Sequence, residues 1–329
     1  MLSQLFERTL NSDSGHVEEI AQNPELVFLI KLQLARKLAE DEIDGSTLPS
    51  RILGPLKEVE FEKDGEHFLC TPRDSIGVPV RMPSSRIEFC YFEYPFAFKK
   101  LAELNGFTPI SEFMFGGKSL YHIGDLVLSI GRIGWYFLNE CDESCLQGLS
   151  SLSYEKILIS SHDERVKQLC QKRGFTFVSL PSIEKGAKLN PTSFLNKSDG
   201  VSALEMARLT EVPLLLDTQT QQIFFFGLEA KRNLVNDYKY LYTLATMGKN
   251  GLTLQSLFSA MELQGHDASV DISEIRRKLK GTVVKTFGDD TVRLKECLQA
   301  FDLPVEKGDT KIKGSPYRLN LTSDQIIFY

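Results

Sequence analysis

Residues 154–180, YEKILISSHDERVKQLCQKRGFTFVSL, limit the possible fold more than any other part of the chain. Their pattern predicts a buried strand in KILIS, a helix from Asp163 to Arg173 and a second strand in FTFVSL. Gly174 is expected to end the helix, because glycine readily takes the left-handed conformation found just after a helix. The three elements form one strand–helix–strand unit, so we expect a mixed α/β-containing module in this part of the chain.

The sequence ahead of this unit alternates between helix and strand patterns. Residues 1–45 have apolar positions at helical spacing, with Pro24 expected to begin a second helical segment. Residues 46–56 are rich in turn-forming residues and are interpreted as a connector. Alternating apolar residues on both sides of Asp64-Gly65 predict a hairpin, since glycine tolerates the positive φ of a type I′ turn. A strand and a helix are expected in IEFCYFEYPFAFKKLAEL, and two more strands in LYHIGDLVLSIGRIGWYFL.

Composition and charge indicate a folded chain of two or three domains. The chain has 329 residues, 42% hydrophobic and 25% charged, which is ordinary for globular proteins. The net charge is −6, but it is uneven: from Pro213 onward the chain has 15 basic and 14 acidic residues. Residues 185–211 are interpreted as a polar loop followed by a short helix, and we place a domain boundary near residue 211. Residues 1–211 would be a mixed sensing or interaction module, with a sub-boundary near 46–56, and residues 212–329 a second domain.

Neither a membrane span nor a metal centre is expected from the sequence. No apolar run approaches the ~20 residues that a spanning helix needs, and LVFLIKLQLA is interrupted by Lys31. The six cysteines include no C-x-x-C pair, and no histidine spacing matches a metal site. We therefore expect reduced thiols in a cytoplasmic protein, and no cofactor or metal.

Residues 212–329 show a specific order of elements. PLLLDTQTQQIFFFGLEAKRN predicts two strands around a polar turn, and LVNDYKYLYTLATMGKNG predicts an amphipathic helix. Thr253 is a candidate N-cap for a second helix, and residues 270–281, VDISEIRRKLKG, predict a short basic third helix. KIKGSPYRLNL is expected to form a turn and a strand. At ~100° per residue, the third helix turns one set of side chains inward and the other outward. The inward set is Ile272, Ile275 and Leu279, and the outward set is Ser273, Glu274, Arg277 and Lys278.

These pieces resemble the OmpR/PhoB-type winged-helix family over roughly residues 212–322. The family often ends its third helix with RRKL, as at residues 276–279, and closes with a G-x-G-Y-R strand, similar to GSPYRL at residues 314–319. The resemblance implies a winged helix-turn-helix whose third helix enters the major groove of double-stranded DNA. It assigns DNA contacts to Ser273, Arg277, Lys278, Lys280, Lys311, Lys313 and Arg318.

The sequence departs from the family pattern at three places. Glu274 stands where the family commonly has a basic residue, and phosphates repel a carboxylate unless it accepts a hydrogen bond from cytosine. Pro316 replaces the second wing glycine and fixes φ near −65°. Residues 282–309 are an insert, longer than the usual link to the wing, and DTVRLKECLQAF within them has the pattern of an extra helix. The insert could alter the DNA surface or dock on another domain.

Candidate sites in the first 211 residues are weaker. The G-K-S triplet at 117–119 has Glu112 where a phosphate-binding loop needs glycine. His162 follows a buried strand at the end where α/β folds place ligands, although Ser and Asp there are also ordinary helix caps. Residues 72–86 hold Arg73, Arg81 and Arg86, which could bind an anion or simply lie on the surface. We assign no catalytic residue.

The leading functional hypothesis is a cytoplasmic DNA-binding transcriptional regulator. The acidic N-terminal module would sense a ligand or protein partner, and a homodimer is expected because half-site spacing follows dimer symmetry. One alternative is a non-enzymatic adaptor whose winged helix binds protein. Another is an enzyme with an active site in the N-terminal α/β part that the winged helix targets, for which the sequence offers less support.

Overall fold

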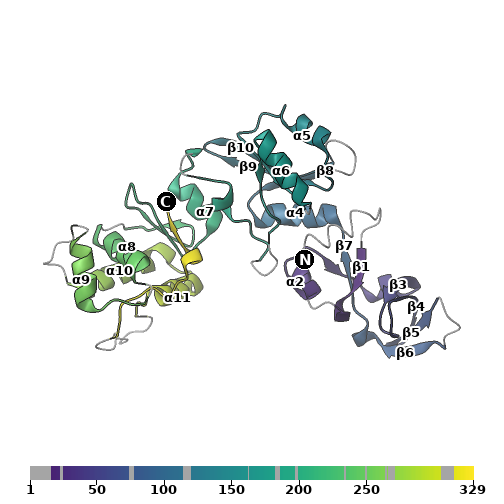
Figure 1. Ribbon diagram of the computed structural model, residues 1–329. Coiled ribbons are helices and arrows are strands. Elements are labelled where there is room, and N and C mark those ends of the chain that lie inside the picture. Colours follow the sequence, from purple (N-terminus) through teal and green to yellow (C-terminus); the bar gives the residue numbers. More distant parts are fainter. Residues whose placement is uncertain are drawn as a thin grey trace. The chain divides into compact units, whose positions relative to one another are not determined.

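The computed structural model places helices and strands in both of its compact units, Met1–Phe194 and Leu195–Tyr329 (Figure 1). This mixture agrees with the expected α+β class. The division into units lies ahead of the boundary that composition indicated near residue 211. The structure describes residues 16–22, 25–73, 78–113, 120–161, 163–181, 186–196, 199–232, 235–248, 250–263, 265, 271–304 and 315–329.

The first unit begins with two small antiparallel sheets that share one core. A three-stranded sheet has the order β1-β7-β2, and a four-stranded meander has the order β3-β4-β5-β6. Phe61 and Phe68 of the meander pack with Phe89 of β7 in their common core. The strands are β1 His16–Glu19, β2 Arg36–Lys37, β3 Ser46–Ser50, β4 Lys57–Asp64, β5 His67–Pro72, β6 Val80–Pro83 and β7 Phe89–Phe92, with helices α2 Glu25–Lys31 and α3 Glu40–Ile43.

Two expectations for this region were wrong. Residues 1–45 are not uniformly helical, because β1 and β2 both pair with β7. Residues 46–56 are not only a connector, because residues 46–50 form β3 and pair with β4. β1 and β2 depend on a strand far along the chain and β3 on the next strand, and in both cases strand pairing overrides the local pattern. The hairpin at Asp64-Gly65 is confirmed: Asp64 pairs with His67, and Gly65 has a φ of 62°.

A five-stranded mixed sheet forms the rest of the first unit, in the order β12-β11-β10-β9-β8. The strand–helix–strand unit is confirmed, with β11 and β12 parallel and Gly174 left-handed at a φ of 76°. α5 and α6 pack on the sheet face of Tyr136, whereas α4 packs on the other face, where Phe98 contacts Phe137. The elements are α4 Tyr94–Leu104, β8 Thr108–Phe113, β9 Leu120–Leu128, β10 Gly131–Leu138, α5 Glu143–Leu149, β11 Lys156–Ser160, α6 Glu164–Arg173 and β12 Thr176–Phe177.

In the second unit, helices α8 to α11 and a four-stranded sheet pack around one core. The two predicted strands are present as β13 and β14, and the last residues of the chain form β16, parallel to β13. The strand expected in KIKGSPYRLNL is not found in its described part, residues 315–321, where only an isolated antiparallel bridge joins Tyr317 to Leu252. The elements are α7 Ala203–Thr210, β13 Leu214–Leu216, β14 Ile223–Phe225, β15 Leu228–Glu229, α8 Val235–Met247, α9 Leu254–Glu262, α10 Ile272–Phe287, α11 Thr291–Ala300 and β16 Ile326–Phe328.

The basic helix is longer than its sequence predicts. Residues 270–281 were expected to form it, but α10 continues through Gly281 to Phe287. Burial of Val283 and Phe287 in the core outweighs the ~1 kcal/mol that an interior glycine costs a helix. The extra helix expected within 282–309 is present as α11.

Two further findings concern the chain as a whole. Within the described ranges, no helix is both long and apolar enough to cross a bilayer. All six cysteines are free thiols, and five of them are buried.

Candidate nucleic-acid interface

The core of the second unit fixes which side of α10 faces outward. The side chain of Asp271 caps the helix by accepting a hydrogen bond from the backbone N–H of Ser273 at 3.1 Å. Ile272, Ile275 and Leu279 are buried in the core, as the helical spacing predicted. The opposite stripe is therefore exposed along the whole helix, through Arg277 and Gly281 to Lys285.

Arg276 holds α10 to three other segments of the second unit. Its Nη1 donates a hydrogen bond to Tyr240 Oη of α8 at 3.1 Å, and its Nη2 donates one to the backbone oxygen of Asp302. The guanidinium also lies 5.5 Å from the ring centroid of Tyr317. Because only 9% of Arg276 is exposed, this arginine orients the helix and is not available to a ligand.

Glu274 pairs with both basic residues that the sequence assigned to the DNA groove. Arg277 Nε and Nη2 each donate a hydrogen bond of 2.7 Å to its carboxylate, and Lys278 Nζ lies 3.3 Å from Oε1. The hydrogen bond from Arg277 is the main reason that the pKa of Glu274 falls to about 2. The carboxylate therefore stays charged at neutral pH and partly offsets the positive charge of the stripe.

The remaining residues of the predicted DNA surface differ in their surroundings. Ser273 is exposed, and its hydroxyl donates a hydrogen bond to the Asp271 carboxylate. Lys280 is half-buried, and Arg318 is exposed next to the bridging residue Tyr317. Lys311 and Lys313 lie outside the described residues. The structure thus brings Ser273, Arg277 and Lys278 to one open face.

α11 leaves the exposed stripe of α10 open. It packs into the core of the unit through Cys297 and Leu298, and Phe301 just after it contacts Phe225. Figure 1 shows α10 among α8, α9 and α11. Since 72% of the Arg277 side chain is exposed, nothing within the described ranges covers this part of the helix.

Asp237 lies buried on α8, facing the inner side of α10. Its Oδ2 accepts a hydrogen bond from Thr282 Oγ1 at 3.3 Å, while Oδ1 has no partner among the described residues. Burial raises the pKa of Asp237 to about 6. A raised pKa means that the folded state holds the proton more tightly than the unfolded state. Asp237 therefore contributes stability below about pH 4, and this contribution is lost as the pH rises through about 6.

Replacing Asp237 by asparagine should remove this pH dependence. The stability of the wild type relative to the D237N variant should fall by about 2 kcal/mol between pH 4.5 and pH 7.5, because about two pKa units separate the folded and unfolded states. Urea denaturation of both proteins at each pH measures this difference in stability. The titration of all other groups is common to the two proteins and cancels in the difference. If the difference in stability between the two proteins were the same at pH 4.5 and pH 7.5, Asp237 would have an ordinary pKa.

The arginines singled out in residues 72–86 do not converge on one place. Arg73 is exposed, and Arg81 pairs with Asp64 at 3.0 Å. Arg86 alone among them lines a hollow of about 430 Å³. His162 and the G-K-S triplet lie outside the described residues.

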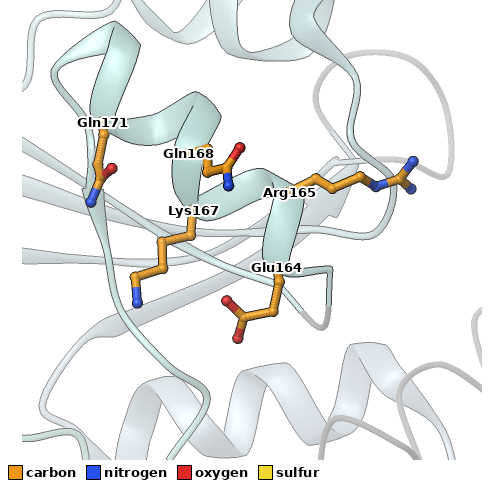
Figure 2. A pocket seen from close by; sticks show the side chains of 5 residues that line it. All are labelled: Glu164, Arg165, Lys167, Gln168 and Gln171. Carbon is orange, nitrogen blue, oxygen red and sulfur yellow. The ribbon is translucent and has the colours of Figure 1, made fainter.

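A second hollow, of about 340 Å³, lies beside α6 (Figure 2). Ligand sites usually combine groups from several elements. Here every lining side chain comes from the same helix, and Arg165 is paired with Asp163 at 2.6 Å. This surface therefore offers little for ligand recognition. The lining residues are Glu164, Arg165, Lys167, Gln168 and Gln171.

Sequence reasoning missed a buried polar cluster on β9 and β10. A β-bulge shifts the register so that His122 lies opposite Tyr136 and Asp125 lies opposite Gly134. Both side chains therefore share one sheet face, where His122 Nε2 is 3.0 Å from Asp125 Oδ1. Arg132 pairs with the same carboxylate. The cluster ties the two strands together, and strict alternation along β9 gives no sign of it.

The arrangement with the clearest chemical meaning is the open basic stripe of α10, held in place by Arg276. Comparisons of the chain with protein-family models, curated proteins and solved structures found no match.

Proposed function

We propose that the second unit is a winged-helix domain that binds double-stranded DNA through the exposed stripe of α10. The observation that carries this proposal is the stripe itself, which is long, open and basic. Arg277, Lys278 and Lys285 are exposed along it, against the single carboxylate of Glu274. Such side chains can contact phosphates and base edges. In this proposal the N-terminal unit senses a ligand or a partner, and two copies act together on DNA.

The packing of the unit supports a winged-helix arrangement. α8, α9 and α10 contribute to one core, and Thr253 caps α9 as the sequence predicted. The bridge between Leu252 and Tyr317 sets the segment after α11 against the segment between α8 and α9. In this proposal the bridged segment serves as the wing, and the exposed Arg318 follows the bridging residue Tyr317.

The adaptor function remains the second candidate because of two features of the same surface. Glu274 partly neutralises Arg277 and Lys278, which weakens the attraction for phosphates. Val284 of α10 and Val292 of α11 are 41% and 66% exposed, and apolar groups beside charged ones suit a protein partner. A protein-binding surface would not show the strong salt dependence of DNA binding.

Titration of a fluorescently labelled duplex with the full chain tests the proposal. Anisotropy should rise with protein concentration at low salt, because a basic helix face supplies sequence-independent contacts to phosphates. Unlabelled duplex should compete. Absence of binding at low salt would contradict DNA binding and leave the adaptor function as the better account.

A Glu274→Gln substitution should strengthen DNA binding several-fold at low salt. The change removes a negative charge next to the phosphates and releases Arg277 and Lys278 from their ion pairs. The gain should shrink as salt screens these charges. Glu296→Gln is the matched control, because Glu296 is exposed on α11 and the substitution changes net charge equally. Equal gains from both substitutions would place the DNA elsewhere than on α10.

A further inference from the structure

A hollow of about 430 Å³ lies beside the two small sheets of the first unit. Its lining residues come from β1 and β6 and from the segments just after β1 and β3 and just before β7, strands that Figure 1 labels. This convergence distinguishes it from the hollow beside α6. Its lining includes Glu19, Arg51, Ile52, Met82, Arg86 and Glu88.

A buried carboxylate organises one wall of this hollow. Glu19 ends β1 and is only 5% exposed. Its Oε2 accepts a hydrogen bond from the backbone N–H of Arg51 at 2.9 Å and another from Ser50 Oγ at 3.1 Å. These bonds fix the backbone at the point where β3 ends, so the base of the Arg51 side chain is held in place.

Two guanidinium groups at the hollow have no acidic partner among the described residues. Arg51 and Arg86 are exposed, and neither forms an ion pair there, whereas Glu88 is already paired with Lys37 at 2.5 Å. Ile52 and Met82 add apolar side chains to the lining. The hollow therefore combines two guanidinium groups that have no ion-pair partner among the described residues with the apolar side chains of Ile52 and Met82. The carboxylate of Glu19 is turned to the backbone of Arg51, and that of Glu88 to Lys37.

We infer that this hollow binds a small organic dianion of the phosphate monoester class. Each arginine can donate two parallel hydrogen bonds to phosphate oxygens, and two arginines match the two charges of a monoester. Ile52 and Met82 would contact the apolar part of the ligand. The volume of the hollow lies in the range of small-molecule sites, about 300 to 1,000 Å³. The inference concerns only the first unit and does not depend on DNA binding.

Methyl NMR on the full chain, with labelled isoleucine and methionine, tests the inference with phenyl phosphate as the probe. The methyl signals of Ile52 and Met82 should shift at millimolar probe, while that of Met261, buried in the second unit, should not. Inorganic phosphate should bind more weakly, because it lacks an apolar part. Benzoate, a monoanion, should also bind more weakly, and benzylamine should not bind. Equal shifts with benzylamine, or none with phenyl phosphate, would overturn the inference.

Arginine variants test whether phenyl phosphate binds in this hollow. The Arg51→Ala, Arg86→Ala double variant should weaken phenyl phosphate ~10-fold or more, because charge-assisted hydrogen bonds are lost. The Arg73→Ala, Arg81→Ala double variant is the control, since both residues are exposed arginines of the same region outside the hollow. The Arg51→Lys, Arg86→Lys variant keeps the charge and should bind at an intermediate level. Unchanged binding in the first variant would overturn the inference.

Discussion

Replacing Arg276 by alanine should lower the free energy of unfolding by about 3 to 4 kcal/mol, the largest stability effect expected here. The substitution removes a nearly buried guanidinium and leaves the Tyr240 hydroxyl and the Asp302 carbonyl without their donor. It also removes the contact with the ring of Tyr317, whose backbone bridges to Leu252. Urea denaturation of the full chain, followed by circular dichroism, measures the change.

Arg277→Ala is the natural control for this experiment. It removes the same side chain from the next position of α10, but there the side chain is exposed and pairs with Glu274 of the same helix. Stability should therefore change little. Similar losses from both substitutions would mean that Arg276 does not join α8, α10 and the segment after α11.

The Arg277→Ala, Lys278→Ala double variant should bind duplex DNA at least ~10-fold, and up to ~100-fold, more weakly than the wild type at low salt. Both side chains lie on the open face of α10, and neither contributes to the core. The loss should therefore come without a change in stability. Anisotropy titrations of the two proteins measure the ratio of affinities.

The control for DNA binding is the Lys231→Ala, Lys295→Ala double variant. It removes the same number of charges from exposed positions of the same unit that are not on α10. Its affinity should stay within a few-fold of the wild type. An equal loss in the two double variants would indicate attraction by net charge alone.

Local signals in the sequence predicted much of the second unit. The inward side of α10 follows from the spacing of Ile272, Ile275 and Leu279, and the start of α9 follows from Thr253, because each depends on residues within one or two helical turns. Gly174 likewise marks the end of α6. These features need no information about distant parts of the chain.

The features that sequence reasoning missed depend on distant partners. β1 and β2 exist because β7 lies between them, and β16 exists because β13 offers an open edge. The basic helix was expected over residues 270–281, but the core continues along α10 to Phe287. Local propensity is a weak guide wherever burial against a remote segment decides the structure.

In the candidate sites, too, local features could be predicted from the sequence, and features that depend on remote segments could not. The outward position of Arg277 and Lys278 could be predicted from helical spacing, but the role of Arg276 could not, because its partners Tyr240 and Asp302 lie 36 and 26 residues away. In the first unit, the sequence made Arg86 a candidate for anion binding because it lies in the arginine-rich segment 72–86. Its neighbour in the hollow, Arg51, lies in a different segment and is placed there only by the fold.

The slope of the logarithm of duplex affinity against the logarithm of salt concentration tests the central claim most directly, when measured for the wild type and for the Arg277→Ala, Lys278→Ala variant. If α10 contacts phosphates through these two side chains, the slope of the variant should be shallower by about 2, because each neutralised phosphate contributes about 0.9. Identical slopes, or no measurable wild-type binding at low salt, would contradict the claim that this helix binds DNA.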